Sequence, residues 1–202
     1  MEGKVKKILA VAASARRNGN SDTLLEQALL GIQEASPDAQ IERLAPYEIP
    51  ITPCRSCRGC WRTGRCVVKD PMQELYVKFS EVDHVVVASP MYFTSVPGHF
   101  KVLIDRFQCF WVRTYRLGEP PMPRRNGMLL CVGGMKRDKD HQCTLTLVKT
   151  WMSTLNMGCP VSRFYPDLDE ANDVLSRPDY LEDARRAGIE LVRLAEKAAE
   201  RE

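Results

Sequence analysis

Lys7-Ile-Leu-Ala-Val-Ala-Ala13 is the stretch near the start of this sequence that decides the expected fold. All its residues after Lys7 are apolar, which is typical of a strand buried on both faces of a sheet. A polar loop follows from Ser14 to Ser21, and the next residues have the apolar spacing of an amphipathic helix until Ser36-Pro37-Asp38 breaks it. This unit of strand, loop and helix predicts a parallel sheet that is covered by helices.

The same alternation recurs along the chain. Continuous apolar runs at 83–89 and 127–132 predict further central strands, whereas the mixed runs at 40–45 and 160–165 predict edge strands. Helices are expected between the strands and after the last one, at about 21–35, 71–80, from 97 onward, 142–156 and 176–199. We therefore expect a single α/β domain over residues 1–202. Its flavodoxin-like, doubly wound, five-stranded parallel sheet has the order 2-1-3-4-5, with helices on both faces.

Composition and charge limit the classes of function. The chain has 202 residues, of which 44% are apolar and 27% charged, and a net charge of +3, so no global charge favours a nucleic-acid or membrane partner. No apolar run has the length of a membrane span, and the first seven residues lack the layout of a signal peptide. These features predict a cytoplasmic protein, in which eight cysteines indicate metal or redox chemistry before disulfides.

Three loops are expected to meet at a ligand site, beyond the carboxyl ends of the strands and where the strand order reverses. They are 14–21, 90–95 and the turn at Gly133. The first loop offers hydroxyls, a fixed cation and a helix N-terminus that together suit a phosphate monoester, through Ser14, Arg16, Asn20 and Ser21. Its glycines match neither the dinucleotide fingerprint nor a Walker loop. The alternative interpretation is an ordinary capped turn.

The second loop, Pro90-Met91-Tyr92-Phe93, adds a flat and mostly apolar surface beside the same point. Such a surface suits an aromatic ring system with polar edges. The alternative is that Met91 and Phe93 simply belong to the core. We find no convincing constellation for acid–base catalysis, and His99 is expected in a solvated or capping role.

Four cysteines are concentrated in a loop at 50–70, at Cys54, Cys57, Cys60 and Cys66. Thiols at steps of three pair poorly as disulfides but can surround one centre, as in loops that hold a [4Fe-4S] cluster. A small zinc knuckle and a cysteine loop without a cluster are the alternatives. The remaining cysteines lie in apolar surroundings and are expected to be buried small hydrophobes: Cys109, Cys131, Cys143 and Cys159.

Three blocks of the sequence resemble one known family. The flavin loop and following helix of the NADPH-dependent FMN reductase family are similar to Ser89-Pro-Met-Tyr-Phe-Thr-Ser-Val-Pro-Gly-His-Phe-Lys-Val-Leu-Ile-Asp-Arg106. The family's phosphate loop resembles Ser14-Ala-Arg-Arg-Asn-Gly-Asn-Ser21, and the cysteine spacing resembles that of its iron–sulfur flavoprotein branch. The resemblance covers roughly residues 5–165.

The resemblance implies a flavodoxin-like fold that binds FMN and assembles into homodimers or homotetramers. It implies that the phosphate is held by Ser14, Arg16, Asn20 and Ser21. It implies contacts to the isoalloxazine from Pro90, Met91, Tyr92, Phe93 and Thr94, with the third side closed by Gly133 and Gly134. The iron–sulfur branch implies a [4Fe-4S] cluster and a ferredoxin-like electron donor, and the family as a whole implies NAD(P)H.

The expected function is thus that of an FMN-dependent oxidoreductase that transfers electrons between a [4Fe-4S] cluster, FMN and an external donor or acceptor. The first alternative is a cluster-free NAD(P)H-dependent reductase of FMN or quinones. The second is a non-catalytic redox sensor whose cysteine loop binds zinc or a partner. Two surface predictions accompany these interpretations. The apolar stretch 107–112 should pack against another subunit, and the arginines between the loop cysteines should attract an acidic electron carrier. The alternative for these arginines is a local role, in which they only offset the negative charge of a thiolate-bound cluster.

Overall fold

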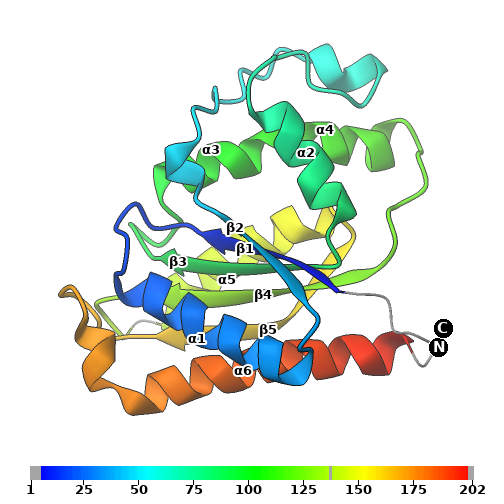
Figure 1. The fold of residues 1–202 in the computed structure, drawn as a ribbon. Coiled ribbons are helices and arrows are strands. Elements are labelled where there is room, and N and C mark those ends of the chain that lie inside the picture. Colours follow the sequence, from blue (N-terminus) through cyan, green and yellow to red (C-terminus); the bar gives the residue numbers. More distant parts are fainter. Residues whose placement is uncertain (1–5, 137, 200–202) are drawn as a thin grey trace.

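The computed structural model describes residues 6–136 and 138–199, and its centre is a parallel sheet in the order β2-β1-β3-β4-β5 (Figure 1). The strands are β1 (Lys7–Ala12), β2 (Gln40–Leu44), β3 (His84–Pro90), β4 (Arg125–Val132) and β5 (Met157–Tyr165). The predicted winding and strand order are confirmed. The continuously apolar strands β1, β3 and β4 occupy the centre, because only there are both faces of a strand covered.

Helices cover both faces of the sheet (Figure 1). One face packs against α1 (Asn20–Ala35) and α6 (Pro178–Ala199). The other carries α2 (Met72–Glu81), α3 (Gly98–Arg106), α4 (Gln108–Trp111) and α5 (Asp138–Ser153). Short turns complete the chain: the 3-10 turns η1 (Pro46–Glu48), η2 (Gly59–Arg62) and η4 (Asp173–Ser176), and the π-helical turn η3 (Val112–Arg116). None of the described helices combines the length and the hydropathy needed to cross a membrane.

Helices α1 and α6 approach so closely that their backbones touch. A Cβ atom on Gly31 of α1 would overlap the carbonyl oxygen of Arg185, and a Cβ atom on Gly188 of α6 would overlap that of Ala28. Glycine is required at both positions, because the neighbouring atom is backbone and cannot move aside. The two glycines therefore set the distance between the helices that close this face of the sheet.

The long helix expected from Pro97 onward is divided. It ends as α3 at Arg106, turns at Phe107, and continues as α4 and η3. The stretch 107–112, which was predicted to pack against another subunit, is largely buried within its own chain. Phe107, Cys109, Phe110 and Val112 are buried, and only Trp111 and Gln108 face outward. Phe107 and Phe110 pack in an aromatic cluster with Tyr76, Phe79 and Trp151, so this stretch gives no support to the predicted assembly.

The scattered cysteines do not share one environment. Cys109 and Cys131 are buried, as expected, and Cys159 is partly buried. Cys143 is exposed, so its prediction as a core residue is wrong. It lies on α5, whose buried residues are spaced so that position 143 faces away from the sheet.

Candidate functional site

The loops after β1, β3 and β4 meet at the carboxyl edge of the sheet and are joined by backbone hydrogen bonds. The Ala13 amide donates to the Ala88 carbonyl (2.9 Å), and the Met91 amide donates to the Val132 carbonyl (2.7 Å). His99, in the first turn of α3, lies with its Nε2 2.8 Å from the Ala13 carbonyl oxygen. The three loops that the sequence singled out therefore form one continuous rim, and His99 is engaged in holding it.

The first loop presents an open helix N-terminus. Gly19 stands at the N-cap of α1, and no side-chain cap is found there within the described residues. Ser14 turns the loop by accepting the Arg16 amide at 3.0 Å, and Ser21 is buried at the start of the helix. Unpaired amides and the positive end of the helix dipole are suitable groups for an anion.

Asn20 is used differently from the other predicted phosphate ligands. Its side-chain amide donates to the Leu168 and Glu170 carbonyls, at 3.4 Å and 2.8 Å, and its Oδ1 accepts the Val174 amide at 3.1 Å. The side chain thus ties the first loop to the connection between β5 and α6. What Asn20 can still offer a phosphate is its backbone amide.

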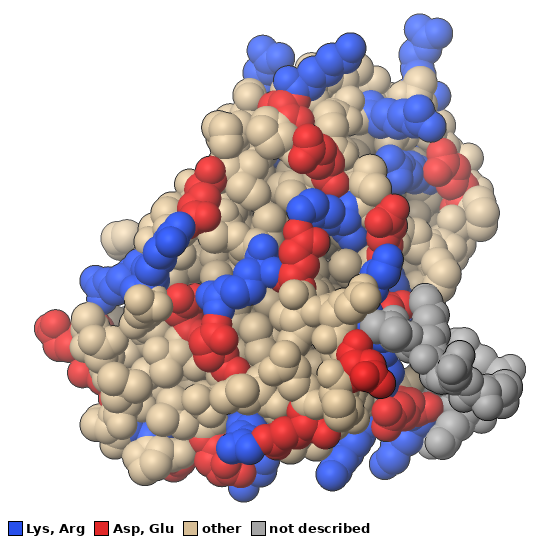
Figure 2. Space-filling view, in the orientation of Figure 1, with Lys and Arg blue, Asp and Glu red and all other residues tan. Residues whose placement is uncertain are grey.

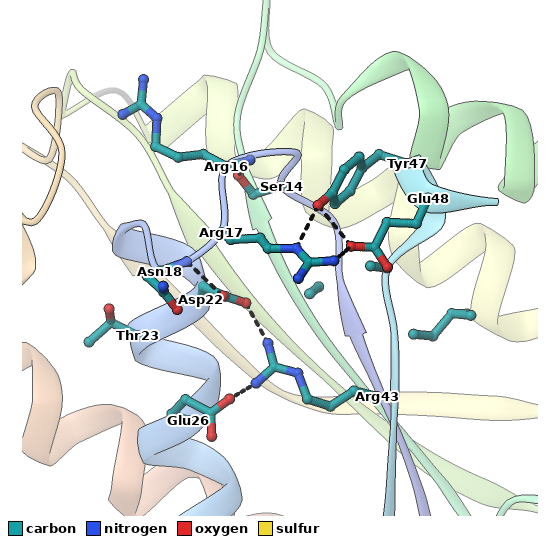
Figure 3. Close-up of a pocket in the computed structure, with 13 residues that line it drawn as sticks. Ser14, Arg16, Arg17, Asn18, Asp22, Thr23, Glu26, Arg43, Tyr47 and Glu48 are labelled. Carbon is teal, nitrogen blue, oxygen red and sulfur yellow. Dashed lines mark hydrogen bonds and ion pairs between the residues drawn. The ribbon is translucent and has the colours of Figure 1, made fainter.

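A cavity of about 450 Å³ lies beside this loop, on its β2 side (Figure 3). The charges in its wall pair with one another. Arg43 contacts Asp22 and Glu26, and Arg17 contacts Glu48 and the Tyr47 hydroxyl. Hydrogen bonds from Tyr47 and Arg17 hold the pKa of Glu48 below its usual value. Arg16 points away from these pairs and has no carboxylate partner among the described residues, so it remains available to an anion (Figure 3).

In the second loop, the ring of Phe93 is exposed to solvent. Tyr92 and Ser95 exchange two backbone hydrogen bonds, and within this tight turn Phe93 and Thr94 have positive φ angles of 49° and 62°. The exposure of Phe93 is 101%, so it is not a core residue. A bulky residue that is both fully exposed and held in the left-handed region is unusual, and such strain is concentrated at binding sites.

The rest of the second loop supports the third. Met91 is partly buried, and its methyl group would lie 3.0 Å from a Cβ on Gly133. A Cβ on Gly134 would overlap the carboxylate of Asp169. A Cβ on Gly133 would crowd Met91 and Phe164, whereas the exposed side chain of Asp169 could move aside for one on Gly134, so Gly133 in particular keeps the rim flat beside Met91. The rim as a whole offers an unpaired cation, open amides, exposed aromatic rings and a glycine wall, which together suit a phosphate joined to a flat ring.

The cysteine loop lies between η1 and α2, at the upper end of the molecule in Figure 1. Cys54 and Cys57 are exposed, Cys60 and Cys66 are partly buried, and all four line one cavity of about 380 Å³. Burial raises the pKa of Cys60, and the three neighbouring thiols act in the same direction. The donor chemistry and the shared cavity suit a thiolate-bound centre. Across the described part of the chain, however, no three His, Cys, Asp or Glu side chains are arranged so that they could hold a metal ion.

The cysteine loop packs against residues from the helical segment 98–116. Arg113 donates from Nε to the Gly64 carbonyl at 2.8 Å, and Arg116 lies 4.2 Å above the Trp61 ring, which Arg58 also contacts. Buried Arg106 contacts both ends of the loop, and Cys109 lines its cavity. The sequence analysis did not place Arg106, Arg113 or Arg116 at this loop. Their spacing along one helical segment was the available signal.

Hydrogen bonds to Asp70 secure the end of the loop. Burial alone would raise the pKa of Asp70. The hydrogen bonds from Arg106 and from the Thr52 amide outweigh this effect and hold the pKa below its usual value. Asp70 also accepts the Met72 amide at 3.1 Å, just before α2, whose N-cap residue is Pro71.

Comparisons with known proteins agree with this arrangement. The model of the NADPH-dependent FMN reductase family matches residues 6–165. The chain is 33% identical over 100 residues to an iron-sulfur flavoprotein of Methanocaldococcus jannaschii, in an alignment that covers 50% of this chain and 51% of that protein. It is 27% identical over 146 residues to an iron-sulfur flavoprotein of Methanosarcina thermophila, covering 72% of each. The chain thus spans about half of the first relative and nearly three quarters of the second.

A solved structure shows the same fold at low identity. The NAD(P)H:quinone oxidoreductase from Methanothermobacter marburgensis superposes with a TM-score of 0.73 at 17% identity, covering 93% of this chain and 96% of that one. At that identity the likeness concerns the fold alone. The family match covers most of the sequence, including all five strands and both loops of the rim that carry the phosphate and ring predictions. The chain therefore belongs to the NADPH-dependent FMN reductase family, a family of flavin-dependent oxidoreductases.

Proposed function

We propose that this chain is an FMN-dependent oxidoreductase that transfers electrons between FMN on the rim and a [4Fe-4S] cluster in the cysteine loop. The observation that carries the proposal is that all four loop thiols line one cavity, and that α3 runs from the rim to this cavity. With nine residues, α3 is roughly 13 Å long. The names of the two relatives support the cluster.

The residues of the rim have distinct tasks in this proposal. Ser14, Arg16 and the open amides at the start of α1, including those of Asn20 and Ser21, would hold the phosphate. Tyr92 and Phe93 would lie against the isoalloxazine together with Pro90, Met91 and Thr94, and Gly133 and Gly134 would let it approach the backbone. FMN, when bound, supplies the exchange between hydride and single-electron chemistry, so the protein needs to contribute position and charge and no general acid or base.

In the cysteine loop, Cys54, Cys57, Cys60 and Cys66 would hold the cluster. The surrounding arginines would offset the negative charge of the thiolates. The electron donor in this proposal is a ferredoxin-like protein or NAD(P)H. Assembly into a homodimer or homotetramer stays a prediction.

A cluster-free NAD(P)H-dependent reductase of FMN or quinones is the second candidate. One observation favours it: the loop thiols, two of them exposed, are not gathered around one point in the described structure. In that case the loop would serve as a structural cover held by Arg106 and Arg113, and the rim would act alone.

One experiment separates the two candidates. The protein is purified without oxygen, reconstituted with iron and sulfide, and analysed for FMN, iron and acid-labile sulfide, together with its absorption spectrum. Stoichiometric FMN with equal iron and sulfide supports the iron–sulfur proposal, and this iron should be lost when Cys57 and Cys60 are replaced by serine. FMN without iron or sulfide supports the second candidate. A protein that takes up neither would contradict both.

A further inference from the structure

Arg106 is the last residue of α3 and is almost completely buried, with 2% of its surface exposed. Its Nη1 donates to the Thr52 carbonyl and to Asp70 Oδ2, both at 2.6 Å. Its Nη2 donates to Asp70 Oδ1 at 3.1 Å and lies 3.5 Å from both the Cys66 sulfur and the Val68 carbonyl oxygen. A buried guanidinium is therefore shared between a carboxylate, backbone carbonyls and one thiol.

These contacts close the base of the cysteine loop. Thr52 lies two residues before Cys54, and Asp70 lies four residues after Cys66. Arg106 contacts both, and Asp70 in turn accepts the Thr52 amide at 2.9 Å. The ion pair with Asp70 is buried on both sides, so removal of the arginine would leave an uncompensated charge. The loop is thus joined at its two ends by one side chain from the helix that begins at the rim.

Arg125 is a second buried arginine, and it shows which of these contacts are unusual. Its Nη1 and Nη2 donate to the carbonyls of Phe79, Val82 and Leu155 at 2.7–3.0 Å. Its sulfur contact, at 3.5 Å, is with the thioether of Met122, which is not a thiol. Arg125 therefore stabilises the end of α2 and touches no residue of either candidate site. Arg106, unlike Arg125, contacts a loop cysteine.

Within the described residues, no other side chain donates to the sulfur of Cys54, Cys57, Cys60 or Cys66. A hydrogen bond to one ligand sulfur, together with a fixed positive charge, stabilises the more negative, reduced state of an iron–sulfur centre. We propose that Arg106 is a positioning residue that places Cys66 in the cavity and raises the reduction potential of the cluster. This inference rests on the cluster proposed above.

The test compares Arg106→Lys with Arg125→Lys in the reconstituted protein. Lysine can still pair with Asp70, but it lacks the second arm that reaches the Cys66 sulfur. In Arg106→Lys we expect a bound cluster whose midpoint potential is shifted to more negative values, while the potential of FMN in the same titration is unchanged. Arg125→Lys should leave both potentials at the wild-type values. A wild-type cluster potential in Arg106→Lys, or an equal shift in Arg125→Lys, would overturn the proposal.

A second measurement uses the iron-free protein and does not depend on the cluster. Amide hydrogen exchange of the segment 52–70 should become about tenfold faster or more in Arg106→Gln, because the loop base opens when the buried pair is broken. Exchange in β4 should not change, and the segment should exchange at the wild-type rate in Arg125→Lys. If Arg106→Gln does not fold, Arg106→Lys provides the same comparison with a smaller expected increase.

The two measurements distinguish two kinds of failure. If the wild-type protein takes up no cluster, the iron–sulfur function is wrong, and hydrogen exchange alone decides whether Arg106 positions the loop. If the cluster binds but exchange in the segment 52–70 is the same in Arg106→Gln and the wild type, the positioning role is wrong and the iron–sulfur function stands.

Discussion

The arginines of this chain have different environments, and the neighbours of each one decide what it can do. Arg16 has no carboxylate partner among the described residues and faces solvent, whereas Arg17, one residue later, is paired with Glu48. Arg106 is buried against a carboxylate and a thiol, and Arg125 is buried against carbonyls. A guanidinium is always charged, so its partners determine whether it binds a ligand, holds a loop or stabilises a helix end.

Arg16 gives the first prediction at this scale. Because a hydrogen bond to a charged group contributes about 1.5–3 kcal/mol, Arg16→Ala should weaken FMN binding by roughly tenfold or more. Affinity for riboflavin, which lacks the phosphate, should hardly change. Arg17→Ala is the matched control and should bind FMN almost as the wild type does. Equal losses for FMN and riboflavin in Arg16→Ala would show that Arg16 does not contact the phosphate.

Phe93 gives the second prediction. Its ring makes no packing contribution that folding would lose, and asparagine accepts a positive φ more readily than phenylalanine. Phe93→Asn should therefore keep or raise the thermal midpoint of the FMN-free protein. It should also weaken FMN binding by roughly two- to tenfold, the value of an aromatic contact of about 0.5–1.5 kcal/mol. A lowered midpoint with unchanged FMN affinity would assign Phe93 a structural role.

At the scale of elements, α3 connects the two candidate sites. Its first turn is joined to the rim by His99, and its last residue closes the cysteine loop. The π-helical turn η3 continues this segment and brings Arg113 and Arg116 onto the loop, at Gly64 and Trp61. π-Helical turns are rare and are often found at functional sites. A displacement of this one segment would change both sites together.

The contact between α1 and α6 gives a prediction of stability. Gly188→Ala would place a methyl group on the Ala28 carbonyl and force the helices apart, at a cost of about 1–3 kcal/mol. The free energy of unfolding in urea should fall accordingly. Gly98→Ala is the control, because a Cβ at Gly98 meets no atom within 4 Å. Its stability should be unchanged or slightly higher, and an equal loss in both variants would point to backbone effects in place of the helix contact.

At the scale of the whole molecule, positive charge gathers around the cysteine loop. Figure 2 shows lysine and arginine side chains at the upper end of the molecule, where the loop lies in Figure 1. Arg55, Arg58, Arg62 and Arg65 are exposed, and no ion pair to a carboxylate is found for them within the described residues. Trp61 lies among them between two guanidinium groups. This surface suits an acidic protein partner, because complementary charge steers association.

The proposed docking of an acidic ferredoxin predicts a strong effect of salt. The Debye length falls from ~10 Å at 0.1 M to ~3 Å at 1 M, so reduction by ferredoxin should slow sharply over this range, while reduction by a small neutral donor should not. The double variant Arg58→Glu, Arg62→Glu should mimic high salt and retain FMN. Arg186→Glu, Arg193→Glu makes the same change of net charge on α6 and should have little effect. Rates that are indifferent to both salt and the loop charges would exclude the docking surface.

The order of the strands could be derived from the sequence because it depends on a local property. A strand that is covered on both faces must be apolar throughout, and 8–13, 85–88 and 127–132 meet that requirement within a few residues. The positions of Ser14, Phe93 and Gly133 on one rim follow from the same order, since loops at the carboxyl ends of parallel strands meet at one edge. The shared cavity of the four loop cysteines could also be predicted, because thiols so close in the sequence cannot lie far apart in space.

Only the tertiary structure decided the contacts between residues that are distant in the sequence. No local pattern shows that Arg17 pairs with Glu48 while Arg16 does not, because Glu48 is distant in the sequence. The same holds for the hydrogen bonds of the Asn20 side chain to the Leu168 and Glu170 carbonyls, and for the burial of 107–112. Arg106 is the clearest example: arginine side chains are mostly exposed in proteins, yet this one is buried because Asp70, 36 positions away, supplies the counter-charge. A buried charge is stable only when its partners are placed around it, and that placement is a property of the folded chain.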